Sequence, residues 1–107
     1  MARRVGTASF AKMLGRRLTA LRLEAGLTQE KLAYETDLAK GHLSMIEAGK
    51  RLPSLAVLVA LAERLEVEPA DVLAFDLEVP RFRILDLLRR GDQAEARRAL
   101  RELGSVK

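Results

Sequence analysis

Two short amphipathic segments within residues 28–48 constrain this chain more than any other feature. The first covers Gln29–Glu35 and the second covers about Lys40–Ala48, with a break over residues 36–38. Each segment carries its apolar residues on one face, at the 3.6-residue period of a helix. Because those faces must be buried, the outer side of the second segment is free to project. Such a helix fits the major groove of DNA, which is about 12 Å wide, although this arrangement alone is only moderately specific.

The flanking sequence predicts an all-α fold, because it is rich in helix formers and poor in aromatic and β-branched runs. Apolar spacing predicts a first helix from Ser9 to Gly26, where glycine suits the end of a helix. Thr28 is expected to cap the second helix and Ser54 to cap a fourth, which reaches Leu65. Pro69 suits the first position of a fifth short helix, about Pro69–Phe75. The apolar face predicted for the fourth helix consists of Leu55, Leu58, Val59, Leu61, Ala62 and Leu65.

The chain divides into three predicted parts. Residues 1–8 lack periodicity and are interpreted as a flexible basic arm, and residues 9–76 as a helix-turn-helix DNA-binding domain. Residues 77–107 are expected to form a C-terminal helical hairpin, with helices over about 81–90 and 92–103. A chain of 107 residues has room for one compact domain and such an extension.

Composition narrows the classes of function. The chain has no Cys and one His, so it offers neither a thiolate zinc site nor the nucleophile and base of a hydrolase, and no cofactor or metal is expected. An enzyme is therefore disfavoured. No apolar run is long enough to cross a bilayer and the N-terminus does not resemble a secretory signal, so a cytoplasmic protein is expected. Residues 1–51 carry a net charge of +5, residues 52–80 of −5 and residues 81–107 of +4. The basic first half suits a polyanion such as double-stranded DNA.

The residues around the two short segments resemble the phage Cro/repressor-like, or XRE-type, family of helix-turn-helix transcriptional regulators. The matching pieces are Gly-Leu-Thr-Gln-Glu at 26–30, Leu-Ala at 32–33, Leu-Ser-x-Ile-Glu at 43–47, Gly-Lys-Arg at 49–51, Pro-Ser at 53–54 and Leu-Ala at 61–62. The resemblance covers about residues 12–75 and implies a five-helix, lambda-repressor-like DNA-binding domain, to which the C-terminal two-helix extension is added.

The resemblance implies which residues meet DNA. The family reads bases from the start and middle of its third helix, which here corresponds to Lys40, Gly41, His42, Ser44 and Met45. Lys40 suits a guanine edge and Met45 a thymine methyl group. Family contacts to phosphate correspond to Gln29, Lys50 and Arg51, with Arg16, Arg17 and Lys12 as further candidates. Gly41 offers no side chain at a position that reads bases in the family, so recognition is expected to depend more on DNA shape.

The resemblance also implies a structural ion pair between Arg22 and Glu47, because the family pairs an arginine of its first helix with the glutamate near the end of its recognition helix. Two positions depart from the family pattern. Ala39 stands where a capping residue is usual, and Asp37 stands where the turn often holds glycine. Asp tolerates a left-handed backbone better than most residues.

The predicted C-terminal hairpin has an apolar face that two helices cannot bury alone. We expect it to support dimerisation, with packing on the subunit's own body and a separate protein partner as the alternatives. A pairing between its arginines and the acidic residues 63–78 is a further hypothesis. The residues assigned to dimerisation are Phe82, Leu85, Leu88, Leu100 and Leu103.

The sequence therefore predicts a double-stranded DNA-binding transcriptional regulator, a repressor, that acts as a homodimer on an inverted repeat. The alternative is an antitoxin-like or adaptor protein that binds a protein partner and regulates its own operon. A nucleoid-type protein that binds all DNA alike is a third reading. Preference for one DNA sequence at matched salt separates the first reading from the last.

Overall fold

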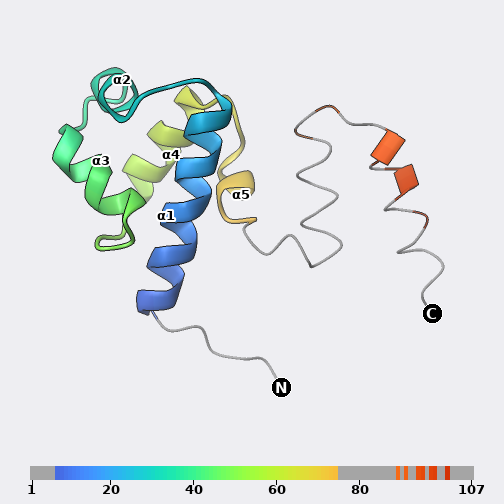
Figure 1. Ribbon diagram of the computed structural model, residues 1–107, viewed down its shortest axis with the longest axis horizontal. Coiled ribbons are helices and arrows are strands. Elements are labelled where there is room, and N and C mark those ends of the chain that lie inside the picture. The colour runs from blue at the N-terminus through green and yellow to red at the C-terminus, as the bar shows by residue number, and fades with distance from the viewer. Residues whose placement is uncertain are drawn as a thin grey trace.

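The structure is a computed structural model that describes residues 7–74 and, beyond them, single positions of the C-terminal part: Arg89, Gly91, Ala94, Glu95, Arg97, Arg98 and Arg101. Residues 7–74 hold five helices and no strand, which confirms the all-α prediction (Figure 1). The helices are α1 (Thr7–Glu24), α2 (Gln29–Glu35), α3 (Lys40–Glu47), α4 (Leu55–Arg64) and α5 (Pro69–Val72).

The helices pack so that α1 lies between α3 and α5. It contacts both of them, while α2 contacts α3 and α4 (Figure 1). Each helix contributes at least one core side chain that is at most 1% exposed, and these side chains meet in a single core, with Leu18, Leu32, Leu43, Leu61 and Val72 among them. Burying side chains of this size stabilises the fold by about 1.5–3 kcal/mol each. The helical pair α2–α3 is thus fixed to the body through its inner faces.

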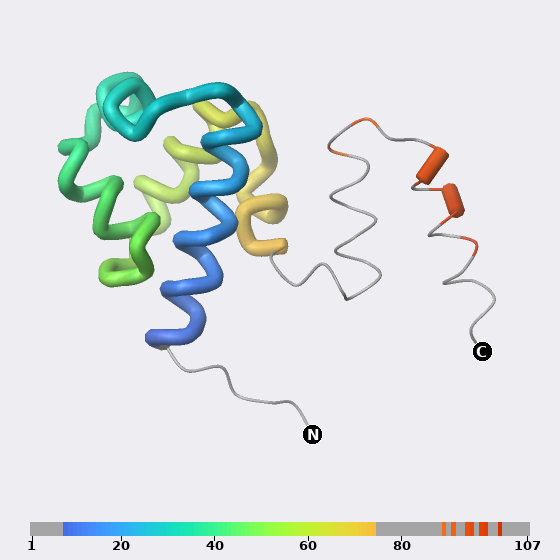
Figure 2. Tube along the Cα trace, in the orientation of Figure 1, coloured from blue at the N-terminus to red at the C-terminus, as the bar shows by residue number. Residues whose placement is uncertain are grey.

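Local signals set the helix boundaries around the functional pair. The Thr28 side chain accepts a hydrogen bond from the amide of Lys31 at 3.0 Å, and the Ser54 side chain accepts one from the amide of Val57 at 3.2 Å. Both predicted caps are therefore confirmed. The tube in Figure 2 follows the chain from α1 across the bundle into α2. Asp37 lies in the turn between α2 and α3 with a φ of +58°, the left-handed backbone for which its residue type is suited.

Some boundaries and faces differ from the prediction. Helix α1 begins two residues earlier than Ser9, and α5 ends at Val72. On α4, Leu55 is 75% exposed and Val59 is also exposed, although both were expected on the apolar face. The buried side of α4 consists of Leu58, Leu61, Ala62 and Leu65, and Leu55 shares their three-residue spacing, so spacing alone does not account for the exposure of Leu55. Val59 lies about 100° around the helix from Leu58, and Leu55 stands in the first turn.

Most of the C-terminal predictions fall outside the described residues. These include the dimerisation set Phe82, Leu85, Leu88, Leu100 and Leu103. At the other end of the chain, the basic arm predicted over residues 1–8 lies outside the described residues except at Thr7 and Ala8, which belong to α1 rather than to an arm. Arg89 is described: its Nη2 donates to the carboxylate of Glu24, at the end of α1, at 3.1 Å. This contact is of the kind expected when the segment packs on the subunit's own body. In the described part of the chain, no helix combines the length and apolarity needed to cross a membrane.

Candidate DNA-binding surface

Helix α3 has a buried side and a solvent-facing side. Leu43, Ile46 and Glu47 are buried against the bundle. With about 100° between successive residues, the exposed positions span an arc of about 140° on the opposite side. We call this arc the outward face of α3. It consists of Lys40, Gly41, Ser44 and Met45.

The structure therefore brings four of the five residues expected to read bases onto one exposed face. The fifth, His42, is half-buried at its edge. Ala39 supplies no side-chain cap to α3, as its residue type dictates. The first backbone N–H groups of α3 are therefore not capped by the side chain that precedes the helix.

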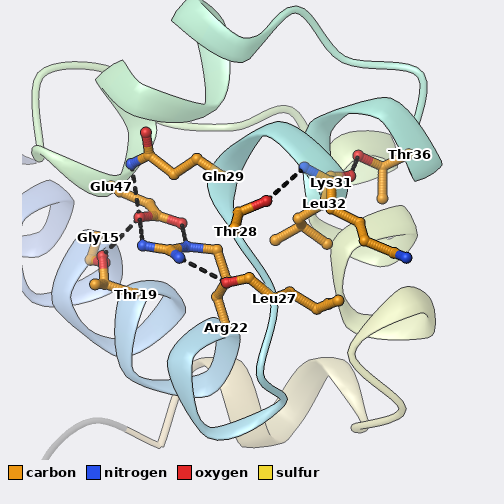
Figure 3. A network of polar contacts seen from close by, with 10 residues as sticks. All are labelled: Gly15, Thr19, Arg22, Leu27, Thr28, Gln29, Lys31, Leu32, Thr36 and Glu47. Atoms are coloured by element: carbon orange, nitrogen blue, oxygen red, sulfur yellow. Dashed lines mark hydrogen bonds and ion pairs between the residues drawn. The ribbon is translucent and has the colours of Figure 1, made fainter.

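The orientation of α3 is fixed by a buried carboxylate, that of Glu47, which gathers donors from α1 and α2 (Figure 3). Arg22 donates from Nε to Oε2 at 2.8 Å and from Nη2 to Oε1 at 3.1 Å. Thr19 and Gln29 donate to the same Oε1, at 3.1 and 2.9 Å. This geometry is the ion pair that the resemblance implied, and two additional donors complete it.

Arg22 also ties the cluster to the chain between α1 and α2. Its Nη1 donates to the backbone carbonyl oxygen of Leu27 at 2.8 Å, directly before the helix that Gln29 begins (Figure 3). Gln29 is the first residue of α2, and its side-chain Nε2 donates to the carboxylate of Glu47 in α3. A phosphate contact by Gln29 would then be coupled mechanically to the position of α3.

The crossing of α1 and α3 is so close that it requires a glycine. A Cβ on Gly15 would lie 2.5 Å from the carbonyl oxygen of Glu47 and 2.6 Å from that of Ile46. No side chain fits at that separation, because both obstacles are backbone atoms. Gly15 therefore sets how deeply α3 sits against α1.

Basic residues lie beside α3 in the loop that follows it and on α1. Lys50 and Arg51 are exposed in that loop, and Arg16 is exposed on α1. The loop crosses α1 near Lys12, because a Cβ on Gly49 would lie 2.8 Å from the Cα of Lys12. The structure thus places two lysines, Lys12 and Lys50, on adjacent segments at the end of α3.

Arg17 is a correction to the sequence-based assignment. It was expected to contact phosphate, but its side chain is buried, with the residue 8% exposed, and its Nε donates to the backbone carbonyl oxygen of Asp71 at 2.8 Å. One residue step on α1 turns the side chain by about 100° from Arg16, toward α5. Arg17 joins α1 to α5, and the phosphate role is withdrawn.

Thr19 belongs to the hydrogen-bond cluster around Glu47, although it was not predicted from the sequence. It stands three residues before Arg22, on the same face of α1, and that spacing could have identified it. Its hydroxyl donates to Glu47 and also lies 2.8 Å from the carbonyl oxygen of Gly15, its partner one turn back. Within the described residues, no group of three or more His, Cys, Asp or Glu side chains is arranged to hold a metal ion.

Comparison with known proteins places this surface in a family. Residues 13–75 match the model described as "Helix-turn-helix domain". The control protein C.BamHI of Bacillus amyloliquefaciens is 36% identical over 70 residues, which cover 64% of this chain and 86% of that protein. The HTH-type transcriptional regulator YazB of Bacillus subtilis is 41% identical over 64 residues, which cover 60% of this chain and 91% of that protein.

Solved structures give the same result. The restriction-modification controller protein C.AhdI of Aeromonas hydrophila is 35% identical with a TM-score of 0.57, covering 58% of this chain and 94% of that chain. The clp gene regulator ClgR of Corynebacterium glutamicum is 31% identical with a TM-score of 0.58, covering 60% and 83%. Residues 13–75, which match the family, include all of α2, α3 and α4. The chain therefore belongs to the helix-turn-helix domain family, and its relatives are consistent with the XRE-type DNA-binding transcriptional regulators.

Proposed function

We propose that this protein is a transcriptional repressor that binds an inverted-repeat operator as a homodimer, with α3 in the major groove of each half-site. The observation that carries the proposal is the outward face of α3, which is exposed while the opposite face is buried in the core. A helix held in this way presents its side chains to base edges.

The side chains on and beside that face supply distinct chemistry. Lys40 donates to O6 or N7 of guanine, and Met45 offers an apolar contact to a thymine methyl group. Ser44 and His42 carry groups that hydrogen-bond to a base or a phosphate. Gly41 offers no side chain, so part of the recognition is assigned to DNA shape.

Residues around α3 are proposed to hold the DNA backbone. Lys50, Arg51 and Arg16 are exposed cations, and each one placed on a phosphate releases counterions. Gln29 joins them at the start of α2, where its hydrogen bond to Glu47 links backbone contact to the seating of α3. These contacts position the protein, and they carry no sequence information themselves.

The dimer follows from the small size of the reading surface. One helix of eight residues reaches only a few base pairs, so a single copy binds weakly. Two copies related by a twofold axis place their recognition helices one helical turn apart, about 34–36 Å, which matches an inverted repeat. A dimer bound where its site overlaps a promoter excludes the polymerase from that promoter, and we propose repression for this arrangement.

The experiment is selection of bound duplexes from a random pool, followed by measurement of the stoichiometry on the selected duplex. Two protein copies on an inverted repeat are expected. A single, asymmetric half-site bound by one copy would contradict the dimer, and equal binding to selected and random duplexes at matched salt would contradict specific regulation. Co-purification of a second protein that covers α3 would favour the antitoxin-like or adaptor alternative.

A further inference from the structure

For four of the five glycines in the described residues, the structure itself explains why the position holds glycine. Gly26 and Gly49 have φ values of +74° and Gly91 has one of +79°, a region that favours glycine. Gly15 lies against the backbone of α3, where a Cβ would clash. The fifth, Gly41, has neither of these reasons.

Gly41 lies in the first turn of α3 with ordinary helical backbone, and a Cβ built on it meets no heavy atom within 4 Å. Glycine is disfavoured in a helix relative to alanine, because it loses more conformational freedom on folding. The fold thus gains nothing from glycine at this position and would be more stable with alanine. The reason for glycine must lie in something that approaches α3 from outside.

The open space beside Gly41 belongs to the outward face of α3, between Lys40 on one side and Ser44 one turn further on. We infer that Gly41 is a clearance position, at which the wall of the major groove contacts the backbone of α3 so closely that a Cβ cannot be accommodated. This inference rests on the proposed function. It assigns to Gly41 a role in specificity, as the residue that sets how deeply α3 enters the groove.

The physical basis is the distance by which a side chain would hold the helix away. A Cβ stands about 1.5 Å from its Cα, and a displacement of that order takes a hydrogen bond out of its range. Base contacts by Lys40 and Ser44 require the deep position, whereas attraction between basic residues and phosphates tolerates a small displacement. The clearance is therefore expected to matter for the selected sequence and little for DNA in general.

The test compares Gly41→Ala with the unaltered protein and with the control Ser9→Ala, which raises helix propensity in the first turn of α1 and lies outside the outward face of α3. The probes are a duplex of about 30 base pairs selected from a random pool by the unaltered protein, long enough for two half-sites, and a random-sequence duplex of the same length. Thermal unfolding is measured on the same samples.

We expect Gly41→Ala to melt at the same temperature as the unaltered protein or a few degrees higher, roughly 4 °C. Its affinity for the selected duplex should fall about tenfold or more, while its affinity for the random duplex and its salt dependence stay unchanged. Gly41→Leu should lose more affinity for the selected duplex, and Ser9→Ala should lose none.

The outcomes separate this inference from the function on which it rests. If the unaltered protein prefers the selected duplex and Gly41→Ala binds it equally well, the clearance is disproved and the regulatory function stands. If Gly41→Ala unfolds, glycine is required by the fold and the inference is also disproved. If the unaltered protein shows no preference for any duplex, the proposed function fails first and the clearance fails with it.

Discussion

Arg22 and Glu47, 25 positions apart in the chain, meet in a two-pronged ion pair that joins α1 to the end of α3. Their side chains are 11% and 4% exposed, so the pair is almost completely removed from water. A guanidinium and a carboxylate in this geometry have a defined relative orientation, because two parallel hydrogen bonds restrict rotation. The recognition helix is consequently held at a fixed angle to the longest helix of the described fold.

Removal of either partner should be strongly destabilising. Glu47→Ala leaves a nearly buried guanidinium without its carboxylate, which costs about 3–5 kcal/mol of unfolding free energy. Urea unfolding measures this change through the transition midpoint. The matched control is Glu35→Ala, which breaks the more exposed Arg64–Glu35 pair and should cost no more than about 1 kcal/mol. Equal losses for the two variants would show that burial of the Arg22–Glu47 pair has no special weight.

Gly15→Ala should push α3 away from α1. The added Cβ meets two backbone carbonyl oxygens, so the obstruction cannot be relieved by rotating a side chain. A cost of about 1–3 kcal/mol is expected, as for an overpacked core. Operator affinity should fall in variants that still fold, because the outward face of α3 is displaced. Wild-type stability and wild-type affinity in this variant would refute the close crossing.

Arg16 and Arg17 are adjacent in sequence and should behave oppositely. Arg17→Gln removes the charged hydrogen bond to the backbone of α5 and should lower stability by about 1.5–3 kcal/mol, without a direct effect on the salt dependence of DNA binding. Arg16→Gln should leave stability within about 0.5 kcal/mol and reduce the slope of affinity against salt. Thermal unfolding and a salt titration on one duplex measure both quantities. An exchange of these two phenotypes would restore the phosphate role to Arg17.

Lys40 and Lys50 should separate reading from clamping. Lys40→Ala is expected to cost about 1–3 kcal/mol of operator affinity and to relax specificity at one base pair. Lys50→Ala should weaken operator and random DNA alike and reduce the salt slope by about one. Competition binding at several salt concentrations distinguishes the two patterns. The same uniform loss in both variants would remove Lys40 from the reading set.

Two leucines on α4 test the corrected apolar face. Leu61 is fully buried, so Leu61→Ala should cost about 2–5 kcal/mol through lost burial and the cavity that remains. Leu55 is mostly exposed, so Leu55→Ala should change the stability of a single subunit by less than about 0.5 kcal/mol. If Leu55→Ala is strongly destabilising in a manner that depends on protein concentration, this side chain is buried between copies.

The sequence predicted the helical pair well because its signals are local. Thr28 and Ser54 cap the helices that follow them through side-chain oxygens. Threonine and serine are preferred at this position, so helix capping can be predicted from the residue type alone. Asp37 likewise adopts the left-handed turn for which its residue type is suited. Spacing within α3 separated Leu43 and Ile46 from the outward face, since 3.6-residue periodicity depends only on neighbours in the chain.

Features that depend on distant partners could not be predicted in this way. The burial of Arg17 depends on the position of Asp71 in α5, and a basic residue in a basic stretch gives no sign of that contact. The exposure of Leu55 and Val59 depends on where the core ends, which the apolar character of α4 conceals. The hydrogen bond between Thr19 and Glu47 depends on the fold that brings α3 to α1, although the spacing of Thr19 to Arg22 already places both side chains on one face of α1.

Helix α3 has eight residues, whereas isolated helices shorter than about 12–15 residues are marginal in water. Packing against the surrounding helices therefore stabilises the helical conformation of α3. A synthetic peptide with the sequence of residues 40–47 would be largely unstructured and could not imitate the protein on DNA. An inhibitor or an engineered DNA-binding protein that uses α3 would therefore have to include the helices that pack against it.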